Sequence, residues 1–294
     1  MANLKEIRTR IASIQSTQKI TSAMKMVSAS KLRHAQNAIS NLKPYSGKLS
    51  AILQNLSSSG EVSDDNPLFK VRNPENVVLI VITSNKGLCG ALNSNVTKEV
   101  HRIVNEKYEK QFRDNKLKLI CIGKKAIEQL QKNYEIIYAN DTLTDAPNFE
   151  EVAKITSDLI NDFIQKKVDK VEIVYNSFVN PATQKIMLED YLPITQEIEE
   201  KCSKKAQSIN YIFEPEPKEF ADELTLKSLK IHLYEILLDS IASEHGARMT
   251  SMTKATDNAI EMLKELKLKY NNARQAAITN ELNEIVGGAE TLKN

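Results

Sequence analysis

The chain has 294 residues, of which 41% are hydrophobic and 27% are charged. This length suits about two ordinary domains, and the composition excludes a chain that is disordered throughout. The longest aliphatic run, from Val77 to Ile82, is far shorter than the roughly 20 apolar residues of a spanning helix, and residues 1–10 lack the apolar segment of a signal peptide. We therefore expect a cytosolic protein without direct membrane insertion.

Cysteine and histidine spacing gives no sign of a disulfide framework or a metal site. The three cysteines, Cys89, Cys121 and Cys202, are too far apart in sequence for a CxxC pair, and their number is odd. The four histidines are scattered, without an HExxH motif. We expect reduced, structural cysteines, no bound metal and no cofactor.

The distribution of helix-breaking residues predicts a long helix at each end of the chain. All eight prolines lie between Pro44 and Pro217, no glycine precedes Gly47, and Gly246 is the only glycine from Pro217 to Val286. Proline costs about 3 kcal/mol and glycine about 1 kcal/mol inside a helix. Long stretches without them are therefore candidates for long helices.

Apolar residues within both stretches recur at steps of three and four, as on one face of a helix. The stripes are Leu4, Ile7, Ile11, Ile14, Ile20, Met24, Val27, Leu32, Ala35, Ile39 and Leu42, then Met252, Ala255, Ala259, Met262, Leu266, Ile278, Leu282 and Ile285. At 1.5 Å per residue, residues 3–57 would span roughly 80 Å and residues 224–286 roughly 90 Å. Gly287-Gly288 is the expected stop of the second helix.

Each helix has a single apolar stripe and needs a partner of similar length, so the two are expected to pair as an antiparallel coiled coil. The alternative is that both helices lie on the central domain as ordinary surface helices. The predicted division is an N-terminal shaft helix at 1–57, a central domain at 58–222 and a C-terminal shaft helix at 223–294.

The central region alternates strands and helices, which predicts an α/β sheet with an antiparallel edge. Asn148 and Glu151 form a possible capping box at the start of one helix. The predicted strands are residues 76–84, 117–123, 135–139, 171–179 and 184–192, and the predicted helices are residues 94–112, 124–132 and a segment that begins after Asn148.

Two motifs invite a chemical interpretation but match it poorly. The turn from Gly87 to Gly90 follows a strand, yet it lacks the third glycine of GxGxxG, and Gly123-Lys124-Lys125 lacks the first glycine and the Ser/Thr of a P-loop. We interpret the first as a tight strand-to-helix turn. Ser243-Glu244-His245 cannot form a triad, because adjacent helix positions point about 100° apart, and we expect these residues to face solvent.

Charge is unevenly distributed, although the net charge is only +2. Residues 1–50 contain nine Lys/Arg and one acid, a balance of +8, whereas residues 51–239 have a balance of −6. A basic helix favours an acidic protein partner, although a solvated helix face remains the alternative. Nucleic acid is not expected as a partner, because the first 44 residues contain no aromatic residue for stacking.

Three segments resemble the gamma subunit of the F-type rotary ATP synthase. They are IRTRIASIQSTQKITSAMKMVSASKLR near the N-terminus, ASEHGARMTSMTKATDNA with LKYNNARQAAITNELNEIVGGAE near the C-terminus, and TSNKGLCGALN in the central region. The resemblance implies a long antiparallel coiled coil with a central Rossmann-like α/β domain. It also implies a non-catalytic rotor subunit in the central stalk, which couples ion flow through the membrane c ring to ATP synthesis or hydrolysis on the beta subunits.

The partners implied by the resemblance are the alpha and beta subunits of the catalytic ring, the epsilon subunit and the c-subunit ring. The implied location is the cytoplasmic face of a bacterial plasma membrane, as a peripheral protein. The resemblance also assigns partner-binding residues: Met24 and Lys25 face an acidic lever of a beta subunit, and Arg248, Arg274, Gln275 and Thr279 bond to catch loops of the ring.

The segment YIFEPEP, with Tyr211, Phe213 and Glu214, matches the foot near the c ring and epsilon. Phe213 stands where a tyrosine is common in the family, and its side chain has no hydroxyl group to make a contact there. One other hypothesis remains open at this point: a nucleotide-dependent α/β enzyme whose long helices serve only to oligomerise it. A static coiled-coil scaffold is compatible with the composition but not with the matched segments.

Overall fold

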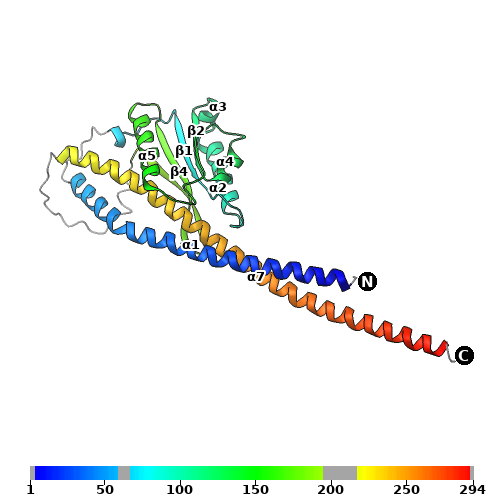
Figure 1. The fold of residues 1–294 in the computed structure, drawn as a ribbon. Helices are drawn as coiled ribbons and strands as arrows, with labels where there is room; N and C mark the ends of the chain where they lie inside the picture. The colour runs from blue at the N-terminus through cyan, green and yellow to red at the C-terminus, as the bar shows by residue number, and fades with distance from the viewer. Residues whose placement is uncertain (1–3, 59–66, 195–216, 292–294) are drawn as a thin grey trace. The chain divides into compact units, whose positions relative to one another are not determined.

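The computed structural model describes residues 4–58, 67–194 and 217–291 (Figure 1). The chain divides into two compact units. Unit 1 consists of Met1–Ser28 and Met249–Asn294, and unit 2 consists of Ala29–Arg248. The two long helices, α1 (Leu4–Ser58) and α7 (Pro217–Thr291), contribute a segment to each unit.

Unit 2 contains a five-stranded sheet with the strand order β3-β2-β1-β4-β5. The pairs β3–β2, β2–β1 and β1–β4 are parallel, and β5 pairs antiparallel with β4 as a hairpin. The predicted α/β sheet with an antiparallel edge is thus confirmed. The strands are β1 (Val77–Ile82), β2 (Leu117–Ile122), β3 (Ile136–Asn140), β4 (Lys170–Asn180) and β5 (Thr183–Leu192).

Helices cover both faces of this sheet. The single helix predicted over 94–112 is divided at Tyr108, which leaves helical dihedrals at a φ of −127° and buries its side chain in the core. Asn148 caps α5 as predicted, because its side chain accepts a hydrogen bond from the N–H of Glu150 at 2.8 Å. The short elements are η1 (Pro67–Phe69), α2 (Leu92–Lys107), α3 (Glu109–Arg113), α4 (Lys124–Leu130) and α5 (Phe149–Ile164).

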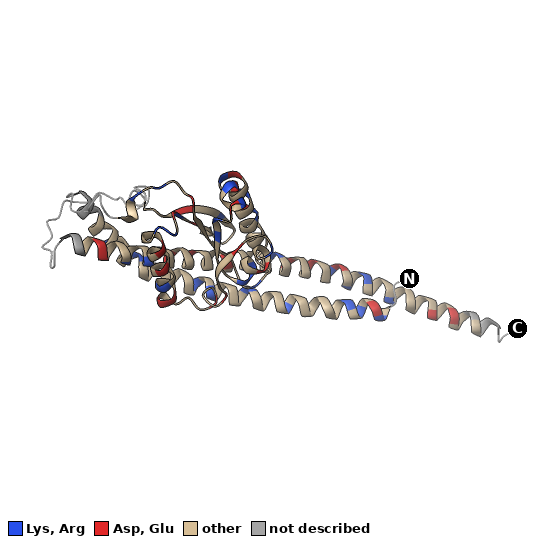
Figure 2. Ribbon diagram, turned by 90° about the horizontal axis from the view of Figure 1, so that it is seen from above, with Lys and Arg blue, Asp and Glu red and all other residues tan. Residues whose placement is uncertain are grey.

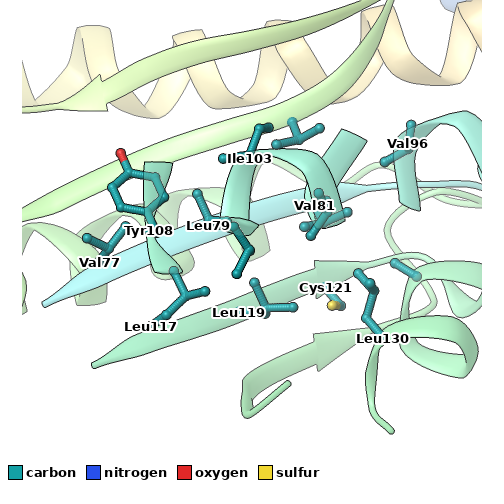
Figure 3. Packing of buried hydrophobic residues seen from close by; sticks show 14 residues of the cluster. Val77, Leu79, Val81, Val96, Ile103, Tyr108, Leu117, Leu119, Cys121 and Leu130 are labelled. Carbon is teal, nitrogen blue, oxygen red and sulfur yellow. The ribbon is translucent and has the colours of Figure 1, made fainter. Parts of the chain in front are cut away.

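The core on one face of the sheet is built from alternate residues of β1 and β2 with α2 and α4 (Figure 3). Val77, Leu79 and Val81 of β1 point the same way because successive strand residues alternate between the two faces. Helix α5 covers the other face with an apolar stripe that includes Ile155 and Leu159. The sheet is therefore packed between helices on both faces.

Both long helices contain helix-breaking residues. Pro44 and Gly47 lie inside α1, as the prediction of a helix over residues 3–57 requires, and α7 begins at Pro217 rather than at the predicted Leu224. Proline is well tolerated in the first turn of a helix, where its missing N–H would have no partner. The predicted stop at Gly287-Gly288 is wrong, because α7 continues to Thr291. Glycine weakens a helix by only about 1 kcal/mol and does not by itself end one.

The two long helices run antiparallel within each unit, as predicted. In unit 2 the hydroxyl of Ser46 donates to Glu235 at 2.7 Å. Near the start of α7, Leu49 of α1 packs with Ala221 and Leu224. Residues later in α1 therefore meet residues earlier in α7, which is the arrangement of an antiparallel pair.

In unit 1 the pairing continues with a seam that differs from the predicted stripe. Thr256 of α7 donates to Thr21 of α1 at 2.8 Å, and both Thr21 and Ser28 are buried. The hydroxyls of Thr21 and Ser28 each donate to a carbonyl one turn earlier in α1, so these small polar side chains fit a close helix contact without an orphaned donor. Ile20 and Val27, predicted for the seam, are exposed instead.

The same correction applies to α7. Met262 was predicted to face α1 but is 54% exposed, whereas the neighbouring Leu263 is 7% exposed. A 4-3 repeat continued from Met252 through Ala259 reaches Leu263 and misses Met262 by one position. The apolar residues displaced from the seam are consequently available on the surface of unit 1.

Candidate partner-binding site

The first part of α1 presents a basic surface with apolar side chains. Lys25, assigned by resemblance to a partner contact, is exposed, and Met24 is half-buried at the edge of the seam. The exposed Ile20 and Val27 are seven residues apart and therefore share a helix face. Figure 2 shows that most charged residues on α1 are Lys or Arg. An exposed stripe with both basic and apolar character suits a partner surface that is acidic and partly apolar.

The later part of α7 carries the second group of predicted contacts. Arg274, Gln275 and Thr279 are all exposed, and the hydroxyl of Thr279 donates to the carbonyl of Gln275 at 2.9 Å. Ile278 and Leu282 lie on the same stretch and are also exposed. These exposed side chains bring polar and apolar groups together on one segment of α7.

Arg248 lies in a different environment from the other predicted contacts. Its side chain is 7% exposed, and its guanidinium bonds within unit 2. Nη2 donates to the carbonyls of Lys86 at 2.8 Å and Gly87 at 3.2 Å, and Nε donates to Gly87 at 3.2 Å. Nη1 donates to Glu244 at 2.6 Å. The predicted contact of Arg248 with another subunit stays a prediction, and the guanidinium joins α7 to the turn after β1.

The prediction that Ser243, Glu244 and His245 face solvent is wrong, because all three are buried. Glu244 pairs with Arg248 one turn later, and Nδ1 of His245 lies 3.4 Å from Nη1 of the same arginine. Burial raises the pKa of Glu244, against the opposing effect of the arginine charge. Burial, helped by the charges of Arg248 and Lys31, lowers the pKa of His245 to about 4.

Several further contacts fix α7 to the sheet of unit 2. The buried hydroxyl of Tyr191 on β5 donates to the carbonyl of Leu229 at 2.9 Å. Asp239 accepts from the N–H of Phe178 on β4 at 3.2 Å. A Cβ at Gly246 would lie 3.0 Å from the ring of Phe178, so the helix approaches the hairpin closely there. These contacts hold α7 from Leu229 to Arg248.

The edge of the sheet where nucleotides bind in many α/β folds is occupied by hydrogen bonds within the chain. The first three N–H groups of α4 donate to Asn85 Oδ1 at 2.9 Å, to the carbonyl of Ser84 at 3.2 Å and to Thr83 Oγ1 at 2.8 Å. Asn85 also donates to Asp145 Oδ2 at 2.8 Å. An anion at this helix terminus would need donors that are already used.

The described residues contain neither a metal-ligand cluster nor a membrane-spanning helix. Within residues 4–58, 67–194 and 217–291, no three His, Cys, Asp or Glu side chains gather as metal ligands. No helix in those ranges is long and apolar enough to cross a membrane. The foot residues Tyr211, Phe213 and Glu214, like Cys202, lie outside the described residues.

The sequence interpretation missed the contacts that attach α7 to the sheet. The Glu244–Arg248 pair has the four-residue spacing of a helical ion pair, which was an available signal. The partners of Arg248 in the turn are backbone carbonyls, and these leave no trace in the side-chain pattern. Tyr191 likewise gives no local sign that its hydroxyl reaches α7.

The chain begins with one long helix and ends with another, and an α/β sheet lies between them in the sequence. This arrangement defines a class of coiled-coil proteins that carry a Rossmann-like domain. A family model described as ATP synthase matches residues 3–292. The chain is 47% identical over 295 residues to the ATP synthase gamma chain of Cytophaga hutchinsonii, with all of both chains covered. It is 49% identical to the gamma chain of Flavobacterium johnsoniae, with 99% of each chain covered. The chain belongs to the ATP synthase gamma chain family.

Solved structures agree with this assignment. A chain in the central stalk and c-ring structure of the Tetrahymena thermophila mitochondrial ATP synthase is 26% identical, with a TM-score of 0.58. The alignment covers 80% of this chain and 99% of that one. A chain of the Euglena gracilis mitochondrial ATP synthase has the same fold, with 19% identity, a TM-score of 0.63, and coverage of 98% and 94%.

Proposed function

We propose that this chain is the rotor subunit in the central stalk of an F-type ATP synthase. It couples ion flow through a membrane c ring to ATP synthesis or hydrolysis on the catalytic beta subunits, and it makes or breaks no covalent bond itself. Support comes from full-length similarity to gamma chains and from likeness to a central-stalk structure. The observation that carries the proposal is the antiparallel pair of α1 and α7 in unit 1, joined through the same helices to the sheet-bearing unit 2.

A rotor must present different surfaces in different directions, because a ligand shifts a conformational equilibrium only by binding the two states unequally. Unit 1 meets this requirement. Its N-terminal helix segment carries Lys5, Arg8, Arg10, Lys19 and Lys25 against the single acid Glu6. The α7 segment instead mixes both signs of charge with exposed apolar residues.

We assign the partner contacts of unit 1 to these two surfaces. Met24 and Lys25 meet an acidic segment of a beta subunit, where Ile20 and Val27 add apolar contact. Arg274, Gln275 and Thr279 bond to loops of the catalytic ring, with Arg274 as the donor of charge-assisted hydrogen bonds to carboxylates. Tyr211, Phe213 and Glu214 belong to the proposed contact with epsilon and the c ring. The proposed functional division is a shaft helix at 1–57, a central domain at 58–222 and a second shaft helix at 223–294.

The chain acts within a membrane-associated complex, as gamma chains do. We place it on the cytoplasmic face of a bacterial plasma membrane, held there as a peripheral subunit through its contacts with epsilon and the c ring. The bacterial relatives that it matches over its whole length support this location.

The proposal is tested by locking the shaft to the ring. A cysteine introduced at Thr279 is oxidised to one in a ring loop of the assembled complex, and ion-driven ATP synthesis is measured before and after reduction. We expect the disulfide to abolish synthesis and a reductant to restore it. The matched control places the first cysteine at Val179, an exposed residue of unit 2. Full synthesis with the Thr279 link formed would favour the static scaffold.

The nucleotide-dependent enzyme is the second hypothesis, and the occupied donors at the start of α4 argue against it. A direct assay separates the two. The purified full-length chain is titrated with ATP in a calorimeter and assayed for phosphate release. Neither binding nor turnover is expected, and a stoichiometric nucleotide complex would support the enzyme instead.

A further inference from the structure

The guanidinium of Arg248 donates several hydrogen bonds within the chain, and its side chain is buried, unlike that of a surface contact residue. One guanidinium reaches two carbonyls of the turn after β1, those of Lys86 and Gly87, and one carboxylate of its own helix, that of Glu244. A planar guanidinium is suited to this work because its donors point in fixed directions within one plane. We call this set of contacts the Arg248 clamp.

The turn held by the clamp is anchored on its other side to the sheet. The hydroxyl of Ser84 donates to the carbonyl of Lys86 at 2.7 Å, so that one carbonyl is bonded from both directions. Asn85 bonds to Asp145 and to the first N–H of α4. The turn is thereby bonded both to α7 and to the carboxyl edge of the sheet.

The conformation of the turn shows that it is held in place. Leu88 has a φ of 65°, a left-handed conformation that bulky residues rarely adopt, and it is 61% exposed. Its neighbours are fixed: Gly87 by the clamp and Cys89 by burial beside Leu92 and Ala247. A strained, exposed residue persists when the surrounding structure leaves it no alternative, and the clamp supplies part of that constraint.

The clamp also has a distinctive place along α7. Arg248 is the last residue of α7 that belongs to unit 2, and Met249 begins the segment that belongs to unit 1. The other hydrogen bonds given above between α7 and the sheet, at Leu229 and Asp239, lie earlier in the helix. The clamp therefore attaches the last residue of the unit 2 segment of α7 to the turn after β1.

We propose that Arg248 is a positioning residue, which locks the turn at 84–90 to α7 so that torque passes between the helix and the sheet without local slippage. The transfer of torque rests on the proposed rotor function, whereas the clamp itself rests only on the geometry of unit 2. It gives Arg248 an intramolecular role, distinct from the contact with a ring subunit that the family resemblance predicts.

The two roles of Arg248 are separated by restoring the attachment without the guanidinium. Arg248→Met removes the clamp in the assembled complex. Ala247→Cys then places a thiol beside the native Cys89, since both positions pack in one buried cluster. Oxidation joins α7 to the turn covalently, and reduction releases it. The measured quantity is the number of ions pumped per ATP hydrolysed, with ATP hydrolysis recorded separately.

We expect Arg248→Met to lower this ratio at least threefold while hydrolysis continues. The disulfide should bring the ratio back to within twofold of the wild type, and a reductant should reverse the recovery. Ala247→Cys alone should leave the ratio unchanged. Arg274→Met with Ala247→Cys is the matched control, and oxidation should not rescue it. A disulfide that forms fully in the Arg248→Met chain without restoring the ratio would overturn the proposal in favour of a ring contact.

A second measurement keeps the proposal testable if the disulfide does not form or the methionine variant does not fold. Arg248→Lys keeps the charge but cannot bridge two carbonyls and a carboxylate with one compact ammonium. Hydrogen–deuterium exchange on the full-length chain should become at least tenfold faster at the amides of residues 85–90. Unchanged exchange would refute the clamp. Because this experiment involves no ring, it would do so whether or not the chain is a rotor.

Discussion

Protonation of His245 provides a quantitative test of the cluster that surrounds Arg248. The imidazole is 7% exposed, and burial lowers its pKa from 6.5 to about 4. The positive charges of Arg248 and Lys31 act in the same direction, and Asp145 opposes them weakly. The folded chain therefore holds this histidine neutral at pH values where the unfolded chain has already taken up a proton.

The sign of the resulting pH dependence follows from proton binding. Between pH 6.5 and pH 4 the unfolded state binds more protons at this residue than the folded state, so stability falls as the pH falls. The difference between 6.5 and about 4, at about 1.4 kcal/mol for each pKa unit, sets an upper limit of roughly 3.5 kcal/mol. His245 contributes its full stabilisation above pH 6.5 and loses it progressively below.

The perturbation that isolates this effect is His245→Gln, which retains a polar side chain that cannot become charged. Urea unfolding of the full-length chain is followed by tyrosine fluorescence, because the chain has no tryptophan and the buried Tyr108, Tyr175 and Tyr191 report on unit 2. Acidic residues titrate in both proteins, so the informative quantity is the difference in the free energy of unfolding between the wild type and the variant.

We expect the wild type to lose roughly 2–3 kcal/mol relative to His245→Gln between pH 7 and pH 4.5. His34→Gln, which replaces an exposed histidine of α1, is the matched control and should follow the wild type. Parallel curves for the wild type and His245→Gln would show that His245 is accessible to protons in the folded chain, and the buried cluster would then be wrongly described.

Four further perturbations test other parts of the structure. Tyr191→Phe removes the hydroxyl that bonds to the carbonyl of Leu229 and should lower the free energy of urea unfolding by about 1–2 kcal/mol; no change would mean that this bond does not hold α7. Gly123→Ala places a Cβ against the backbone oxygen of Thr83 at a φ of 107° and should cost roughly 3 kcal/mol or more, so a full yield of equally stable chain would contradict the geometry. Lys25→Glu should reduce ion pumping per ATP more than the yield of assembled complex, and the opposite pattern would exclude a moving acidic partner. Leu282→Ser removes a side chain that is 56% exposed and should weaken binding to the catalytic ring by about tenfold, with the stability of the isolated chain unchanged.

The long helices and the sheet could be predicted from the sequence because their signals are local. No proline or glycine precedes Pro44 in α1, and Gly246 is the only one of either between Pro217 and Val286 of α7. The two strands around Asn180-Pro181 carry the pattern of a hairpin. The seam of unit 1 was predicted less well. Thr21 and Ser28 occupy buried positions because their hydroxyls bond to their own helix, whereas a search for large apolar residues selects the exposed Ile20 and Val27.

The attachment of α7 to the sheet could not be predicted in the same way. Its acceptors are the carbonyls of Lys86, Gly87 and Leu229, which every residue possesses. Glu244 and His245 appeared to be solvent-facing because ionisable residues usually are. Their burial depends on Arg248 and on a turn about 160 residues earlier in the chain, a relation that only the folded structure provides.

Rotation of the chain inside its complex is the most direct test of the account. The catalytic ring is immobilised, and a bead is attached through Val71→Cys, at a residue of unit 2 that is 77% exposed, in a chain that also carries Cys202→Ser. The native Cys89 and Cys121 are buried and should not react. On addition of ATP the bead should turn continuously in one direction and stop when ATP is exhausted. A bead that stays still while the same complexes hydrolyse ATP at the full rate would contradict the account.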